Sequence, residues 1–212
     1  MRVGLLAPEL VGAHGWGRYA LDLGRALAAQ GVELVIAASE ASPGDGGLPH
    51  QGYHPILPSL FPPRRWITPR GLLAVPRLIA AFRGCDLLHA AAEHYLPAAA
   101  LVAGRRPVFV TAHGTYLPQG VARRRVAALY RWAARRATVL AVSRYTARRV
   151  EAVLPGARLL VIPNGVHAER FATPPAIRPD RRGPTVLSVG VNKARKGFHV
   201  LLEAMALVRR EV

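Results

Sequence analysis

The loop Gly12–Arg18 has the clearest chemical potential in this sequence. It lies between a short apolar run and an amphipathic segment, so it precedes an expected helix. The free backbone N–H groups and the dipole at the start of a helix favour a phosphate. The motif Gly15-x-Gly17-x-x-Ala20 also fits the dinucleotide-binding fingerprint, in which Glu40 could bind a ribose. In that fingerprint the first glycine directly follows the strand, whereas here several residues intervene. The glycines could instead serve only a tight turn and close helix packing.

A second group of chemically capable side chains consists of His89, Glu93 and His94. Two histidines that flank a carboxylate suggest a metal site. Positions five apart share a helical face poorly, however, and the segment begins as the end of an expected strand. We therefore expect no metal here. A strand-end histidine that is satisfied within the protein, or contacts to a ligand, explains this group better.

The expected helix Val121–Ala137 carries the most concentrated charge. At about 100° per residue its two faces differ sharply. The apolar face contains Val126, Ala127, Leu129, Tyr130, Ala133 and Ala134. The opposite face contains Arg124, Arg125, Arg131, Trp132, Arg135 and Arg136, and Arg105 and Arg106 could extend it. A tryptophan among arginines suits a membrane interface with anionic headgroups. An ordinary solvated helix face is the alternative.

The net charge of +17 indicates an anionic partner, because 29 basic residues stand against 12 acidic ones. Lys193 and Lys196 are the only lysines, and an arginine bias of this kind could also reflect a GC-rich genome. The charge alone does not distinguish nucleic acid, acidic lipid and phosphorylated substrates. Specific nucleic-acid binding is not expected, because the aromatic platforms or recognition helix that it requires are missing from the pattern.

The elements that position these residues alternate between apolar strands and amphipathic helices. Continuous apolar strands separated by helices indicate an α/β fold, a Rossmann-like parallel sheet with helices on both faces. The expected strands are Val3–Pro8, Val32–Ser39, Asp86–Ala90, Pro107–Thr111, Thr138–Val142 and Arg158–Ile162. The expected helices, besides Val121–Ala137, are Trp16–Gln30, one that starts near Pro69 and breaks at Pro76, Leu96–Ala103 and Ser143–Leu154. The stretch Ala41–Pro63 is expected to be mostly loop.

A change of composition divides the chain near residue 172. Residues 172–183 are rich in proline and arginine and are the best candidate for a linker. A strand at Thr185–Val189 and a helix at Phe198–Arg210 are expected to follow. That helix would place Leu201, Leu202, Met205 and Val208 on one side.

Composition also excludes several classes of protein. With 51% hydrophobic residues the chain can bury a core, but no apolar run reaches the roughly 18 residues that a membrane span needs. The run Val3–Ala7 is too short for a signal peptide. The single Cys85 allows no internal disulfide, which agrees with a cytoplasmic protein.

Several short motifs occur together and in order along the chain. They are Gly15-Trp16-Gly17-Arg18-Tyr19, Asp86-Leu87-Leu88-His89, Val110-Thr111-Ala112-His113-Gly114-Thr115, Val142-Ser143, Ile162-Pro163-Asn164-Gly165-Val166 and Arg195-Lys196-Gly197. With this set, the chain from Met1 to Val212 resembles the retaining glycosyltransferases of family 4, which have the two-domain GT-B architecture.

This resemblance implies roles for individual residues. His113 matches the histidine that reaches the transferred sugar, where it would hydrogen-bond a hydroxyl and stabilise charge at the reacting carbon. The nucleoside diphosphate sugar would be bound by Gly15, Gly17, Arg195 and Lys196. The acceptor side or the cleft would contain His89, Glu93, His94 and Asn164. No metal and no cofactor is implied. Val191 stands where the family usually has an arginine.

The resemblance also implies a division of labour between domains. Residues 1–171 would form the acceptor-side domain, 172–183 the linker, and 184–212 the first strand and helix of a nucleotide-sugar-binding domain. We therefore expect the isolated chain to be incomplete and a second polypeptide to supply the rest. A non-catalytic acceptor- or membrane-binding module, or one half of a split transferase, remains open. The expected partners are a nucleotide sugar, a hydroxyl acceptor and an anionic membrane surface, at the inner face of the cytoplasmic membrane.

Overall fold

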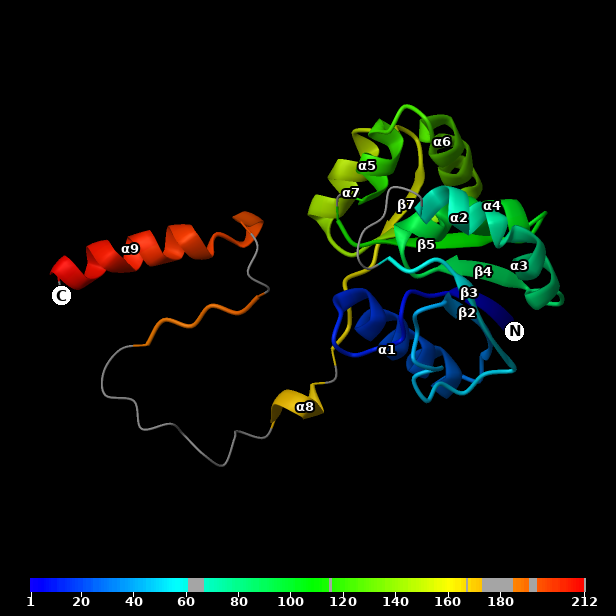
Figure 1. The fold of residues 1–212 in the computed structure, drawn as a ribbon, viewed down its shortest axis with the longest axis horizontal. Coiled ribbons are helices and arrows are strands. Elements are labelled where there is room, and N and C mark those ends of the chain that lie inside the picture. The colour runs from blue at the N-terminus through cyan, green and yellow to red at the C-terminus, as the bar shows by residue number, and fades with distance from the viewer. Residues whose placement is uncertain (61–66, 115, 167, 173–184, 191–193, 212) are drawn as a thin grey trace. The chain divides into compact units, whose positions relative to one another are not determined.

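The computed structural model describes residues 1–60, 67–114, 116–166, 168–172, 185–190 and 194–211. The chain forms two compact units, Met1–Gly165 and Val166–Val212, and each is described by itself. The first unit contains the parallel sheet (Figure 1). The domain and linker boundaries expected from the sequence stay a prediction, because residues 173–184 lie outside the described residues.

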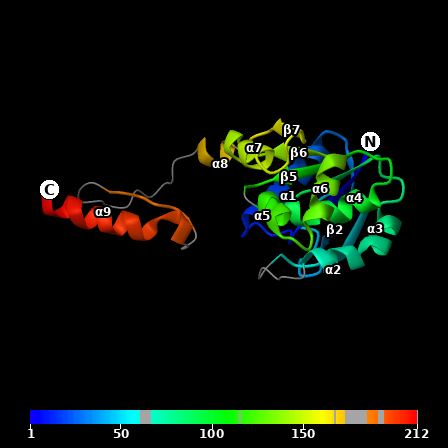
Figure 2. The same cartoon turned by 90° about the horizontal axis from the view of Figure 1, so that it is seen from above.

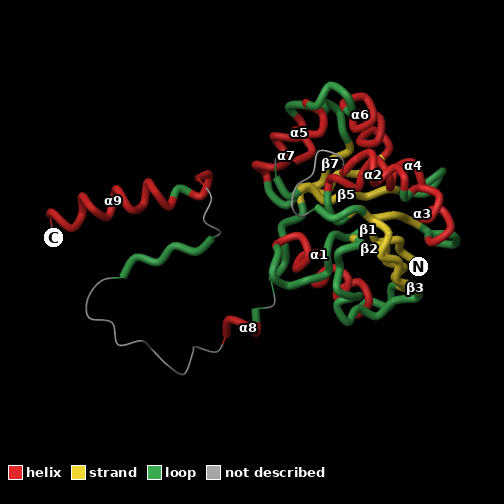
Figure 3. The backbone as a smooth tube through the Cα atoms, viewed as in Figure 1, coloured by secondary structure: helices red, strands yellow, loops and turns green. Residues whose placement is uncertain are grey.

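Seven strands of the described chain form one sheet, in the order β3-β2-β1-β4-β5-β6-β7, and every adjacent pair is parallel (Figure 3). They are β1 (Arg2–Leu6), β2 (Glu33–Ser39), β3 (Gly52–Leu57), β4 (Leu87–Ala90), β5 (Val108–Ala112), β6 (Ala137–Ala141) and β7 (Arg158–Val161). The parallel sheet expected from the apolar strands is confirmed. The expected loop at Ala41–Pro63 is wrong in part, because it contains β3. Pro55 concealed this strand, and an edge position tolerates a proline.

Helices cover both faces of the sheet. In the first unit they are α1 (Gly15–Ala29), α2 (Ile67–Leu73), α3 (Val75–Ala81), α4 (Leu96–Val102), α5 (Tyr116–Ala122), α6 (Ala127–Arg136) and α7 (Arg144–Glu151), with a 3-10 turn, η1 (Glu93–Tyr95). Leu5 of β1 packs in one core with Leu21 of α1, whereas its neighbour Leu6 packs in another core with Leu78 of α3 and Leu96 of α4. Figure 2 shows α4 and α6 side by side over this second core. Because both faces are buried, β1 reads as an uninterrupted apolar run.

The single helix expected at Val121–Ala137 is wrong, because α5 ends at Ala122 and α6 begins at Ala127. The break folds α6 back against α5 at Gly120. A Cβ at Gly120 would lie only 2.9 Å from the ring of Tyr130, so the two helices meet there. In one continuous helix these two residues would stand about 15 Å apart along the axis. Arg124 and Arg125 consequently lie in the turn between the helices rather than on a helical face.

The second unit contains α8 (Glu169–Ala172), a 3-10 turn, η2 (Ala194–Lys196), and α9 (Phe198–Glu211). The helix expected at Phe198–Arg210 is confirmed. The strand expected at Thr185–Val189 is wrong, since these residues are irregular and exposed. A strand needs a neighbour that pairs with its backbone N–H and C=O groups, and no strand within the described residues pairs with this segment.

The order of the strands reverses between β1 and β4. From β1 the chain moves to β2 and β3 on one side, and it then returns to place β4, β5, β6 and β7 on the other. In open parallel sheets the carboxyl ends of the strands at such a reversal form a crevice, because the connections diverge there. The loops that follow β1, β4 and β5 therefore converge at one edge of the sheet.

Candidate active site

His113 lies directly after β5 at this edge, and its side chain is held by several contacts. Its Nε2 donates a hydrogen bond to the carbonyl oxygen of Ala91, 2.9 Å away. The ring of Tyr19 from α1 meets the imidazole edge to face, with 4.7 Å between the ring centres. Burial lowers the pKa of His113, which keeps the imidazole neutral. Because Nε2 carries the proton, Nδ1 is left as a hydrogen-bond acceptor.

Glu93 anchors the backbone of the same histidine. Its side chain is fully buried, and its Oε1 accepts the backbone N–H of His113 at 2.8 Å. Burial raises the pKa of Glu93 to about 7, although hydrogen bonds from backbone N–H groups, among them those of His113 and Gly114, oppose the shift. The other oxygen, Oε2, has no hydrogen-bond partner within the described residues. Glu93 thus holds the turn after β5 from inside the protein, and it is not exposed to a ligand.

A hydrogen-bonded chain connects α1 to the interior of the sheet. The hydroxyl of Tyr19 lies 2.7 Å from Oγ1 of Thr111, which lies 2.8 Å from Nε2 of His89. His89 is only 6% exposed, and burial lowers its pKa to about 4. This arrangement is that of a strand histidine satisfied within the protein. Contact of His89 with an acceptor stays a prediction.

An aromatic cluster lies beside His113 at the start of α1. Trp16 meets His94 at 5.4 Å and Tyr116 at 4.8 Å between ring centres, both edge to face. Burial, and secondarily the positive charge of Arg123, lower the pKa of His94 to about 4. The aromatic contacts tie the first turn of α1 to η1 and α5. The sequence singled out His94 for chemistry but did not indicate this aromatic cluster.

The two glycines of the loop before α1 have different surroundings. An added Cβ at Gly15 would meet nothing within 4 Å, and Gly15 is exposed at the helix start. An added Cβ at Gly17 would collide with the backbone carbonyl oxygens of Glu9 and Val11. Gly17 therefore allows α1 to pack closely against the loop, whereas the space over Gly15 is open to a ligand. Binding of a diphosphate at either glycine stays a prediction.

The remaining candidate residues lie elsewhere. Asn164 is exposed after β7, two strands from β5. Arg195 and Lys196 belong to η2 of the second unit, and their contact with a nucleotide sugar stays a prediction. Glu40, the ribose candidate, is paired with Arg70 at 3.2 Å. Among the described residues no group of three or more histidine, cysteine or acidic side chains could hold a metal ion.

The arginine surface is only partly as expected. Arg124, Arg125, Arg131 and Arg135 are exposed. Trp132 is 38% exposed, and the guanidinium of Arg136 lies 5.4 Å from the centre of its ring. Arg106 does not extend this surface, because its guanidinium donates to the carbonyl oxygens of Phe82, Val102 and Ala103. No helix in the described segments is long and apolar enough to span a bilayer.

Ionisation of the buried Glu93 carboxyl should lower the free energy of unfolding near neutral pH, and replacing Glu93 by glutamine should remove this decrease. The carboxyl titrates near 4.5 in the unfolded chain and near 7 in the folded one. Between these values the unfolded state releases the proton first, so the free energy of unfolding falls as the pH rises. The loss is complete above pH 7 and amounts to about 3 kcal/mol.

Urea unfolding of the wild type and of Glu93→Gln at pH 4 and pH 8 measures this effect. The difference between the two proteins should change by about 3 kcal/mol in favour of the variant at the higher pH. The buried histidines titrate in both proteins and cancel in the difference. A difference that does not change with pH would contradict a Glu93 whose pKa is raised by burial.

The sheet topology and the site together define a Rossmann-like α/β domain with its candidate residues at the carboxyl edge of the strands. The sequence pattern of Glycosyltransferase Family 4 matches residues 13–170, which include α1, η1 and His113. The chain therefore belongs to Glycosyltransferase Family 4. No curated protein matches this sequence closely enough to serve as a relative.

Solved structures with similar folds share little sequence with this chain. UDP-GlcNAc 2-epimerase from Methanocaldococcus jannaschii is 12% identical, with a TM-score of 0.49 over 77% of this chain and 46% of that one. An alpha-glucosyltransferase, solved in complex with UDP and a 13-mer DNA containing an HMU base, is 13% identical, with a TM-score of 0.48 over 78% of this chain and 43% of that one. The chain thus spans less than half the length of both proteins.

Proposed function

We propose that the first unit is the acceptor-side domain of a retaining glycosyltransferase. The enzyme would transfer a sugar from a nucleoside diphosphate to a hydroxyl group. The family match over residues 13–170 carries this proposal, because it covers nearly all of the unit that contains His113. The convergence of the loops after β1, β4 and β5 at one edge supports it, since ligands of open parallel sheets bind at such a reversal.

His113 is proposed to contact the transferred sugar. Its Nε2 is engaged by Ala91, whereas Nδ1 has no partner within the described residues and can accept a hydrogen bond from a sugar hydroxyl. A neutral imidazole that is fixed by Ala91, by the backbone contact to Glu93 and by Tyr19 needs little reorganisation when charge develops at the reacting carbon. The role of His113 is therefore electrostatic and positional, and not that of a nucleophile.

Gly15 is proposed to lie near the donor diphosphate. The open space around its Cα and its place at the helix start would let a phosphate approach the backbone N–H groups of α1. Arg195 and Lys196 of the second unit would offset the negative charge on the leaving diphosphate. No metal is part of the proposal, so EDTA in the assay should leave the transfer rate unchanged.

Transfer of radiolabel from a panel of nucleoside diphosphate sugars tests this function. We expect the purified 212-residue chain alone to give negligible transfer to soluble polyols or to a lipid extract. Transfer should appear when a polypeptide with a complete nucleotide-sugar-binding domain of the same family is added, and the new glycosidic bond should keep the anomeric configuration of the donor. The physical reason is that the donor, in this proposal, is bound mainly by a second domain.

The other outcomes of this assay have distinct meanings. Transfer by the chain alone would refute the need for a second polypeptide but not the transferase function. An inverted product would refute retention. Acceptor binding without nucleotide binding in calorimetry, together with no transfer in either mixture, would refute the transferase and favour a non-catalytic acceptor-binding module. Such a module would use the same edge of the sheet at the cytoplasmic face of a membrane.

A further inference from the structure

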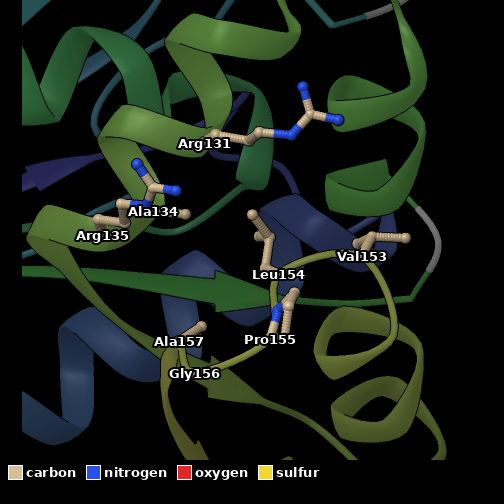
Figure 4. A pocket seen from close by; sticks show the side chains of 8 residues that line it. All are labelled: Arg131, Ala134, Arg135, Val153, Leu154, Pro155, Gly156 and Ala157. Atoms are coloured by element: carbon tan, nitrogen blue, oxygen red, sulfur yellow. The ribbon is translucent and has the colours of Figure 1, made fainter.

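A pocket lies at the amino ends of the strands, on the opposite side of the sheet from the carboxyl ends where His113 lies. It has a volume of about 330 Å³ and is formed by one face of α6 and the loop before β7 (Figure 4). It is lined by Arg131, Ala134, Arg135, Val153, Leu154, Pro155, Gly156 and Ala157. The C-terminal end of α6 leads into the first residue of β6, and the loop leads into the first residue of β7. The pocket therefore lies at the amino edge of these strands, whereas His113 follows the carboxyl end of β5.

Two arginines supply the charge of this pocket. Arg131 and Arg135 are four residues apart on α6, so they share a helical face. Both are exposed, and within the described residues neither side chain forms a hydrogen bond or an ion pair. Arg136, by contrast, donates to the carbonyl oxygen of Gly104. Two guanidinium groups without an internal partner can both point to one external anion.

Nearby negative charge is scarce. Residues 94–168 contain twelve arginines and a single acidic residue, Glu151. Oε1 of Glu151 accepts the backbone N–H of Gly156 at 3.3 Å, and Glu151 forms no ion pair with either pocket arginine in the described part of the chain. The partial negative charge at the C-terminal end of α6 is the other opposing group, and Arg135 and Arg136 in the last turn offset it.

The floor of the pocket is apolar. Ala134 is 1% exposed and Leu154 is 7% exposed, and both belong to the core beneath the pocket. Inorganic phosphate would gain nothing from such a floor, whereas a carbon group next to a phosphate would bury apolar surface there. The volume lies at the lower end of the range of about 300–1,000 Å³ that is usual for small-ligand sites.

We propose that this pocket binds the phosphate of an organic phosphate ester, with Arg131 and Arg135 on the phosphate oxygens and the carbon portion against Leu154. Arginine suits this task because its planar fork of N–H donors matches phosphate oxygens. An anionic lipid headgroup and a soluble sugar or glycerol phosphate share this chemistry. The proposal does not depend on the transferase function, because the pocket is at the other edge of the sheet.

Binding to two probes tests the proposal. Vesicles of phosphatidylglycerol, compared with vesicles of phosphatidylcholine, represent the lipid source, and sn-glycerol 3-phosphate represents the soluble source. Whichever of the two probes the wild-type protein binds, the double variant R131Q/R135Q should weaken that binding at least about tenfold. The matched control R77Q/R83Q removes two exposed charges on and just after α3, and it should change binding by less than about twofold.

Each outcome decides the question. Binding to the acidic vesicles alone identifies a lipid headgroup, and binding of glycerol phosphate identifies a soluble ester. Either result supports the proposal if R131Q/R135Q weakens binding at least about tenfold and R77Q/R83Q changes it by less than about twofold. An equal loss in the two double variants would mean a non-specific effect of net charge and would overturn it. Absence of binding to both probes, with circular dichroism showing that the proteins are folded, would overturn it as well.

Discussion

An alanine at Gly17 is expected to lower the free energy of unfolding by about 3 kcal/mol or more. The added Cβ would lie closer to the carbonyl oxygens of Glu9 and Val11 than Cβ atoms come in real structures. These are backbone atoms, so they cannot move aside as the end of a flexible side chain could. The preference of a helix for alanine over glycine recovers only about 1 kcal/mol. Either α1 or the loop 7–14 must shift.

Gly15→Ala is the matched control for this variant. It makes the same chemical change two residues earlier in the same helix, where the new methyl group has open space. Its free energy of unfolding should equal that of the wild type or exceed it by up to about 1 kcal/mol. Urea unfolding of both variants measures the difference. Equal stability of Gly17→Ala and Gly15→Ala would contradict the close packing of α1 on the loop.

The second large effect is expected from His113→Ala in the reconstituted transfer assay. Removing the imidazole should lower kcat by roughly 10²–10³, the usual cost of losing one positioned group that stabilises transition-state charge. The substitution removes the hydrogen bond to Ala91 and the ring contact with Tyr19, but it leaves the backbone N–H of His113 on Glu93. The fold around β5 should therefore persist.

His54, which is not among the candidate site residues, provides a control for His113→Ala. His54 lies within β3 at the border of the sheet, and His54→Ala should leave kcat within about twofold of the wild type. A thermal unfolding curve for each protein separates loss of chemistry from loss of fold. The proposed role of His113 would fail if its variant, folded at the assay temperature, transferred sugar at the wild-type rate.

Local patterns predicted most of the fold because they depend on neighbouring residues. The strands β1, β2, β4, β5, β6 and β7 were evident as apolar runs, since both faces of a parallel sheet are buried. Ser143 was a correct helix start, and its Oγ accepts the backbone N–H of Thr146. The errors arose where distant residues decide. Gly120 packs against Tyr130 once the chain turns between α5 and α6, and β3 exists because β2 pairs with it in spite of Pro55.

The candidate site was predictable to a similar extent. His113 stood out at the end of a strand, and the loop before α1 stood out by its glycines. The contacts of His113 with Tyr19 and Glu93 are not evident from the sequence, because both residues are far from His113 along the chain. The pattern of His89, Glu93 and His94 suggests Glu93 as a ligand, yet its carboxyl group points into the protein and holds the backbone of His113.

The amino-acid order by itself determined the class of fold, the family, and the presence of a histidine and a glycine loop at the ends of strands. These features follow from short-range periodicity and from motifs that need no knowledge of strand order. Only the tertiary structure decided that Gly17 packs while Gly15 stays open, that Arg106 is bound internally, and that Arg131 and Arg135 share a pocket with Leu154. The contact of Arg106 with Phe82 and the pocket between α6 and the loop before β7 join segments that the strand order brings together, and strand order is a property of the whole sheet. The packing of Gly17 depends on the exact path of the loop before α1, which the sequence pattern does not specify.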